Sequence, residues 1–276
     1  MGQFLNQSLD RVSQVESIER ELLKLKDKMV NEWNSVPLVM SEKYSTDQLV
    51  ELDTNTFERF SPHPYLSIES APYPKGVSPF SLRSTVKENL TKAAKLLNEL
   101  WPEAKLKIFD CYRPLEVATF LARREARRLM SEDKDQGVFQ GDPTNPTEAE
   151  YKKYFGDPRQ MFAIPSDNPL TPPPHSTGAA VDLTIVSPAG VEIDFGGAVD
   201  DPPPTSFPLT YAKDGGSYDQ IYDNWRKFLL ALMSKFEFAR LPREWWHFSF
   251  GDQRWAKIQQ KITGNSQICA FYPRIG

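Results

Sequence analysis

Proline is unevenly distributed along this 276-residue chain, and the distribution limits where regular structure can form. Of the 23 prolines, 13 lie between Pro143 and Pro208. A proline fixes its own φ angle and lacks an amide donor, so it interrupts helices and is excluded from central strands. Residues 131–174, where this segment begins, also lack hydrophobic periodicity. A non-periodic stretch of that length inside a domain is typical of a functional lid or binding loop.

Hydrophobic periodicity elsewhere in the chain predicts the regular elements. We expect helices at residues 5–29, 85–100, 114–130 and 221–236, and strands at residues 106–109, 180–186, 191–195 and 244–250. The strand at 191–195 should pair with the one before it as a hairpin. Internal repeats are absent. This order of elements favours a single α+β domain, with a central antiparallel sheet flanked by helices, over alternating βαβ units.

The predicted N-terminal helix carries one apolar stripe, from Leu5 to Met29, at spacings of three and four residues. Such a stripe must be covered by another surface. We interpret the segment as a helix laid on the surface of the domain, and a coiled coil that forms a homodimer is the alternative. The chain is accordingly divided into a helical extension, residues 1–40, and one domain, residues 41–276.

Two local patterns predict where helices begin and end. Thr85 is followed three residues later by Glu88, which is the pattern of a capping box. The helix expected to end near Met130 has four basic residues in its last turns, which complement the negative end of the helix dipole. We interpret these residues as a solvated helix end: Arg123, Arg124, Arg127 and Arg128.

Composition excludes several classes of function. The chain has 33 Lys and Arg against 37 Asp and Glu, a net charge of −4, and so lacks the cationic field that nucleic acid or an anionic membrane would require. Two cysteines cannot form a disulfide framework. Signal-peptide features and long apolar runs are also absent. We therefore expect a cytoplasmic protein with neither nucleic acid nor membrane as a partner.

The chain has three histidines, and one of them introduces a candidate metal motif. In His175-Ser-Thr-Gly178-Ala-Ala-Val-Asp182 the histidine leaves a proline-rich loop, the glycine permits a tight turn, and the aspartate emerges on the polar face of the next strand. Both side chains can point at one centre. An imidazole and a carboxylate are good ligands for a divalent metal, especially zinc.

A second histidine strengthens this hypothesis. His247 lies in an aromatic strand, three residues after Glu244. On a regular strand those two side chains would face opposite ways, so we place Glu244 at the strand entrance, near Pro242. There it can approach a metal-bound water without being a ligand. Two histidines and one aspartate, with a fourth position left for water, match the open coordination of a catalytic zinc site.

Three motifs, in this order, resemble the D-alanyl-D-alanine dipeptidases of the vancomycin-resistance type. They are Asp110-Cys111-Tyr112-Arg113-Pro114, His175-x-x-Gly178-x-Ala180-x-Asp182 and Glu244-x-x-His247. Leu183-Thr184 and Trp245-Trp246 extend the similarity, which runs from about Lys105 to Asp252. The wider family includes zinc D,D-carboxypeptidases and relatives of the Hedgehog fold. The resemblance implies a Hedgehog/D,D-peptidase-like fold here.

The resemblance also implies a role for each matched residue. His175, Asp182 and His247 would hold one Zn²⁺ per chain. Glu244 would be the general base, taking a proton from the attacking water and returning it to the leaving amine. Arg113 would hydrogen-bond the carbonyl oxygen as it becomes an oxyanion.

A fourth segment, Asp194 to Asp200, resembles the family segment whose aspartate pairs with the free ammonium of the dipeptide. We assign this role to Asp200, with Asp201 as a close rival. The implied protein is a zinc metallopeptidase that hydrolyses D-Ala-D-Ala, or a similar small D,D-dipeptide derived from the peptidoglycan of the cell wall.

The chain departs from the family pattern at Pro173, where a serine usually stands two residues before the first histidine. Proline removes a donor and stiffens the approach to His175, so the substrate-facing wall is expected to differ. Two alternatives stay open: a carboxypeptidase or endopeptidase acting on longer peptidoglycan stem peptides, and a non-catalytic, zinc-stabilised interaction module. The missing export signal and cell-wall-binding module favour the dipeptide.

Other conspicuous residues are given no chemistry. His63 lies between two prolines, outside every motif, and is interpreted as a loop residue. Trp245 and Trp246 are expected to pack rather than to stack on substrate. Cys111 has no neighbouring base in the sequence.

Overall fold

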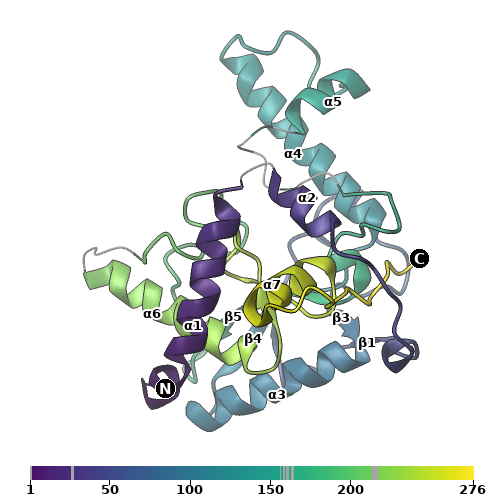
Figure 1. Ribbon diagram of the computed structural model, residues 1–276. Helices are drawn as coiled ribbons and strands as arrows, with labels where there is room; N and C mark the ends of the chain where they lie inside the picture. Colours follow the sequence, from purple (N-terminus) through teal and green to yellow (C-terminus); the bar gives the residue numbers. More distant parts are fainter. Residues whose placement is uncertain are drawn as a thin grey trace.

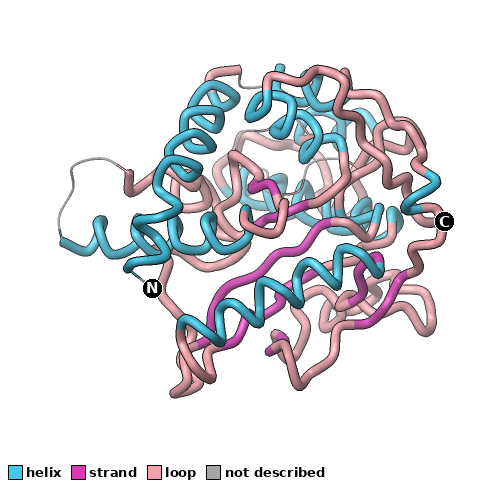
Figure 2. The backbone as a smooth tube through the Cα atoms, turned by 60° about the horizontal axis from the view of Figure 1, so that its bottom comes forward, coloured by secondary structure: helices cyan, strands magenta, loops and turns pink. Residues whose placement is uncertain are grey.

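The computed structural model has the α+β architecture that the sequence predicts (Figure 1). It describes residues 2–25, 28–155, 157, 159, 162, 165–212 and 217–276. Within these ranges the chain forms seven α-helices and two β-sheets. Figure 2 shows the strands in the middle of the molecule, with helices around them.

The larger sheet has five strands in the order β2-β4-β5-β7-β6. They are β2 (Glu58–Arg59), β4 (Lys105–Asp110), β5 (Ala180–Val186), β7 (His247–Ser249) and β6 (Ala239–Arg240). Neighbouring strands are antiparallel, as predicted, except for β2, which runs parallel to β4. β5 is central and almost wholly buried. The smaller sheet pairs β1 (Leu49–Glu51) with β3 (Ser81–Arg83).

The helices cover this sheet. They are α1 (Gly2–Leu23), α2 (Met29–Asn34), α3 (Ser84–Leu100), α4 (Leu115–Asp135), α5 (Glu148–Tyr154), α6 (Ser217–Ser234) and α7 (Gln253–Thr263). α3 packs against β4 and α6, and α1 packs against α6 and α7. α4 and α5 pack together at the top of Figure 1.

The N-terminal stripe is buried in the chain's own core. Val12 and Val15 belong to the main hydrophobic cluster, and Ile18 and Leu22 to a second one. This confirms a helix packed on the domain. The predicted length is wrong, because α1 ends at Leu23. Whether residues 41–276 form a domain without the first forty residues stays a prediction.

The capping box predicted at Thr85 is wrong. α3 begins one residue earlier, at Ser84, and its N-cap residue makes no side-chain capping bond. Instead, the hydroxyls of Ser84 and Thr85 both donate to Asp47 Oδ1, at 2.8 and 3.0 Å. A carboxylate from the preceding segment therefore complements the positive end of the helix dipole.

The arginine cluster is not the end of its helix. α4 continues to Asp135, beyond the predicted end near Met130. Arg123 pairs with Glu148 of α5 at 2.7 Å, and Arg127 donates to the hydroxyl of Tyr151 at 3.2 Å. Two of the four arginines thus join α4 to α5, and the interpretation of the cluster as the end of the helix is wrong.

Two further predicted segments differ from the structure. Residues 131–174 contain the end of α4 and all of α5, which begins with a capping box at Thr147 and Glu150. Residues 191–195 do not form a strand: among the described residues, their backbone pairing with the preceding segment consists of one isolated bridge, Val186 to Glu192, and the hydrogen bonds from Ser187 N–H to Val191 O and from Ile193 N–H to Ile185 O. The hairpin opens soon after its turn.

Candidate metal centre and substrate pocket

Gly178 lets the chain turn from the first histidine into β5. His175 begins a short 3-10 helix, His175–Thr177, and Gly178 follows it with a φ of 70°. A Cβ atom at Gly178 would lie 2.8 Å from the side chain of Leu49. Both the left-handed backbone and the lack of space therefore require glycine. Asp182 follows on β5, as the motif predicts.

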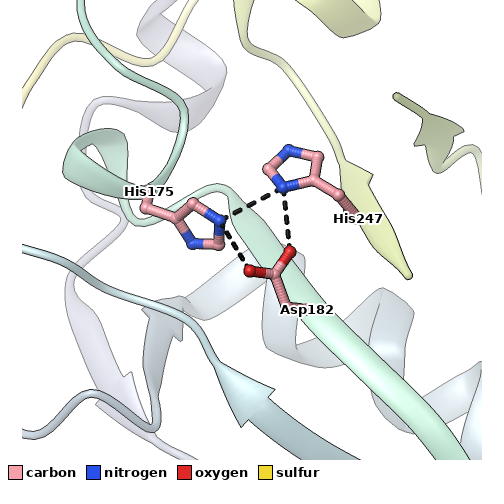
Figure 3. A group of neighbouring side chains, drawn as sticks. All are labelled: His175, Asp182 and His247. Atoms are coloured by element: carbon pink, nitrogen blue, oxygen red, sulfur yellow. Dashed lines mark hydrogen bonds and ion pairs between the residues drawn. The ribbon is translucent and has the colours of Figure 1, made fainter. Parts of the chain in front are cut away.

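Antiparallel pairing brings in the second histidine. Asp182 of β5 and His247 of β7 are direct register partners, so their side chains lie on the same face of the sheet. Figure 3 shows them converging with His175. His247 Nδ1 lies 2.9 Å from Asp182 Oδ1, His175 Nε2 lies 3.2 Å from Asp182 Oδ2, and the two nitrogens are 3.1 Å apart.

The donor atoms of this triad suit a cation. His175 Nδ1 donates to the carbonyl of Cys111 at 2.6 Å, so its proton is on Nδ1 and the lone pair of Nε2 faces the centre. The second imidazole and a carboxylate face the same point, and all three residues are buried. Burial opposes the charge of Asp182, but the two histidines lower its pKa. Two imidazole nitrogens and a carboxylate are suitable ligands for a divalent metal ion. These donor atoms do not specify which metal it is.

Glu244 lies outside β7, at the strand entrance, as expected. Its carboxylate Oε2 is 3.7 Å from His247 Nδ1, and its side chain is 32% exposed. Burial raises the pKa of Glu244, and His247 opposes this rise. A carboxylate whose pKa is raised toward neutrality is suited to general-base chemistry.

Arg113 is held in the pocket by Asp110. The Asp110 carboxylate is fully buried and accepts from Arg113 Nε at 2.8 Å and Nη2 at 2.7 Å. The same Nη2 lies 3.7 Å from Asp182 Oδ2. Burial lowers the pKa of Arg113, but Asp110, Tyr65, Asp182 and Asp200 together raise it by more, so the guanidinium stays charged.

His63 faces the Asp110 carboxylate that holds this arginine, a contact that the sequence did not suggest. It lies in a loop, as expected, but is only 5% exposed. Its Nδ1 accepts from the amides of Tyr65 and Leu66, at 3.2 and 3.3 Å, so its proton is on Nε2. Nε2 faces Asp110 Oδ1 at 3.4 Å. The only sequence signal was a histidine enclosed by prolines.

Asp200 lines the same pocket, and Asp201 does not. Asp200 Oδ2 accepts from the hydroxyl of Tyr65 at 2.6 Å, whereas Asp201 Oδ2 accepts from the amide of Ala198 at 2.8 Å. Desolvation raises the pKa of Asp200 to about 7. Tyr65, which also receives a bond from Arg113 at 3.4 Å, is a second residue that the sequence did not suggest.

These groups open into one cavity of about 240 Å³. Much of its wall is the segment predicted to be a lid or binding loop, with Phe162, Pro165, Ser166 and residues 171–174. Part of that predicted segment, residues 156, 158, 160, 161, 163 and 164, lies outside the described residues. Trp245 and Trp246 are buried and do not line the cavity, so they pack as predicted.

The fold and this pocket are those of a peptidase family. A family model described as D-ala-D-ala dipeptidase matches residues 76–266, about two-thirds of the chain. The chain belongs to the D-alanyl-D-alanine dipeptidase family, as the three motifs indicated. A D-alanyl-D-alanine dipeptidase of Synechocystis sp. is 33% identical over 235 residues, which cover 83% of this chain and 92% of that protein.

Two predictions from composition, that the chain has neither a membrane span nor a disulfide, can be compared with the described residues. Among the described residues, none of the helices is both long and apolar enough to span a membrane. Cys111 is buried and carries no disulfide, and burial raises the pKa of its thiol well above the usual value. A neutral thiol in that position supports the assignment of no chemistry to it.

Proposed function

We propose that this protein is a zinc-dependent dipeptidase that hydrolyses D-Ala-D-Ala or a closely similar D,D-dipeptide. The observation that carries the proposal is the convergence of His175, Asp182 and His247 on one point in a cavity that Glu244 and Arg113 also line. A peptide bond held in this cavity would face a base, a cation and a metal site together. Membership of the dipeptidase family supports the substrate.

His175, Asp182 and His247 are the residues that would hold the metal. When bound there, Zn²⁺ supplies a Lewis acid that makes water a stronger nucleophile at neutral pH. The hydrogen bond from His175 Nδ1 to the carbonyl of Cys111 fixes the orientation of that ring. With one nitrogen of each ring bound to the metal, neither histidine would be free for proton transfer.

Glu244 moves the protons. Its carboxylate takes one from the attacking water and transfers it to the nitrogen of the departing amino acid. The distance of 3.7 Å between its Oε2 and His247 Nδ1 supports this role for a carboxylate that would not itself be a ligand. Because its pKa is raised, the pKa of Glu244 lies closer to the pKa values of the groups with which it exchanges protons.

Arg113 and Asp200 act on the substrate. Asp110 holds the guanidinium of Arg113 as a preorganised fork, ready to hydrogen-bond the carbonyl oxygen as negative charge develops there. Asp200 would accept the free ammonium of the dipeptide, and Tyr65 orients its carboxylate. A requirement for a free ammonium beside the scissile bond would exclude the D-Ala-D-Ala end of a longer stem peptide, because that nitrogen is acylated there.

The second candidate is a carboxypeptidase or endopeptidase that acts on stem peptides. The cavity volume favours the dipeptide, because about 240 Å³ lies below the roughly 300–1,000 Å³ of pockets that enclose drug-sized ligands. A stem peptide would need an open groove. The interaction module without turnover is disfavoured by the presence of both Glu244 and Arg113 in the cavity wall.

The test is to incubate the zinc-loaded protein with D-Ala-D-Ala, with L-Ala-L-Ala and with a stem pentapeptide, and to measure released alanine. We expect release from the first substrate only, lost on chelation and restored by zinc. Release of D-alanine from the pentapeptide alone would identify the carboxypeptidase. Stoichiometric zinc without hydrolysis of any substrate would identify the interaction module.

A further inference from the structure

Arg254 is the second arginine of the cavity, and nothing in the proposed function uses it. It is the second residue of α7 and lines the cavity together with Glu244 and His247. Arg113 already has a carboxylate partner, whereas the guanidinium of Arg254 makes no ion pair or hydrogen bond within the described part of the chain. A charged group of fixed sign therefore borders the cavity without a counterion.

The charges around Arg254 do not compensate for the burial of its guanidinium. Burial lowers the pKa of Arg254, and the attraction of Asp252, Glu244 and Asp182 does not offset that effect. A desolvated cation without a contacting partner is destabilised, and an anion that enters the cavity would relieve this. An anion that contacts Arg254 would therefore be stabilised there, although carboxylates line other parts of the cavity.

The helix that carries Arg254 is held firmly in place. Gln253 Nε2 donates to the carbonyls of Val36 and Leu170, at 2.7 and 3.1 Å, and Lys257 pairs with Glu32 of α2 at 2.7 Å. α2 contributes Val30, Trp33 and Asn34 to the same wall. Arg254 is therefore presented from a wall braced by two other segments.

Part of this wall lies outside the match to the family model. α2 lies before residue 76, where the match to the family model begins. The opposite approach to the metal site is formed by Pro172, Pro173 and Pro174, which have no amide donors. A carboxylate entering this side of the cavity would find few hydrogen-bond donors in that segment, and the guanidinium of Arg254 supplies up to five.

We propose that Arg254 binds the free α-carboxylate of the dipeptide substrate and so selects for an unblocked C-terminal residue. The inference rests on the proposed function. Asp200 would hold the ammonium and Arg254 the carboxylate, with the peptide bond between them at the metal triad. Asp200, Asp182 and Arg254 all line this cavity, and Asp182 acts electrostatically on the other two. The cavity thus recognises a dipeptide by the opposite charges at the two ends of the substrate.

The kinetic test compares D-Ala-D-Ala with its C-terminal amide, which lacks the negative charge. Wild type should strongly prefer the acid. Arg254→Gln should raise KM for the acid by roughly 10- to 100-fold, with kcat nearly unchanged and the amide unaffected. Arg254→Lys should recover part of the preference. Arg124→Gln removes one charge from an exposed position of α4 outside the cavity and should behave as wild type.

A binding measurement separates failure of this inference from failure of the proposed function. Calorimetric titration of zinc-loaded Glu244→Gln protein with the acid and the amide reports the carboxylate contact without turnover. Tighter binding of the acid that disappears in Glu244→Gln/Arg254→Gln supports Arg254, even if wild type hydrolyses neither compound. Hydrolysis of D-Ala-D-Ala with an acid preference that survives Arg254→Gln would overturn the inference and leave the dipeptidase intact.

Discussion

Replacing Asp200 with asparagine should stabilise the metal-free protein above neutral pH while weakening its binding of the dipeptide. Asp200 borders the cavity and accepts a hydrogen bond from Tyr65 at 2.6 Å. Desolvation raises the pKa of Asp200 from 3.8 to about 7. Asparagine keeps an acceptor oxygen and tolerates the φ of 67° at this position, so the substitution removes mainly the charge.

The magnitude follows from the rise in pKa. A change from 3.8 to about 7 corresponds to roughly 4 kcal/mol at neutral pH. Because one side of the carboxylate faces the cavity and its water, we expect a gain in the free energy of unfolding of about 2 kcal/mol. The gain arises because the variant no longer holds an uncompensated charge at this point in the wall.

The sign of the pH dependence is fixed. Between about pH 4 and 7 the folded chain keeps a proton on Asp200 that the unfolded chain has lost. The stability that this group contributes is fully present below about pH 4 and is lost as pH rises through 7. Asparagine does not titrate, so the advantage of the variant should be largest near pH 8 and vanish near pH 4.

Urea unfolding in the presence of a chelator, at both pH values, measures this difference. Asp201→Asn is the matched control, because that carboxylate accepts from the amide of Ala198 and lies outside the cavity. It should give no gain. A variant at position 200 that is no more stable than wild type near pH 8, or equally stabilised at both pH values, would refute the reasoning. With an N-acetylated dipeptide as the comparison substrate, the wild-type preference for a free amine should shrink in the variant.

Three further substitutions test other parts of the molecule. Glu244→Gln should lower kcat by about 10³-fold with the zinc content unchanged, and a loss of less than about 10-fold would mean that another group is the base. His63→Phe keeps the ring but removes the Nε2 proton that faces Asp110, and should reduce kcat/KM by roughly 10-fold without changing metal content; wild-type activity would contradict this. Glu19→Ala leaves Arg240 buried without its partner and should lower the free energy of unfolding by about 3–5 kcal/mol in urea titrations, a loss that an exposed pair would not show.

The local part of the metal site was predictable from the sequence. His175, Gly178 and Asp182 are close in the chain, and a left-handed turn followed by strand alternation is enough to aim both ligands at one point. Glu244 could be placed outside the strand because period-two alternation would otherwise turn it away from His247. Both conclusions need only the geometry of a few consecutive residues.

Predictions of helix ends failed where a distant side chain replaced the local one. Asp47 receives the hydroxyls at the start of α3, and no pattern within residues 84–88 reveals it. The arginines of α4 pair with α5, across a connection that has no periodicity of its own. Local rules state that the end of a helix needs a partner, but a side chain from a distant segment can be that partner.

By itself, the sequence determined the fold class, the family and the three residues of the candidate metal site, because these depend on periodicity and on short motifs. Only the tertiary structure decided what surrounds them. His63, Tyr65 and Arg254 lie outside the motifs: His63 and Tyr65 contact Asp110 and Asp200, and Arg254 lines the cavity. A side chain that acts through contacts remote in sequence leaves no spacing to be recognised, so the uneven prolines indicated the lining of a site but not the charges within it.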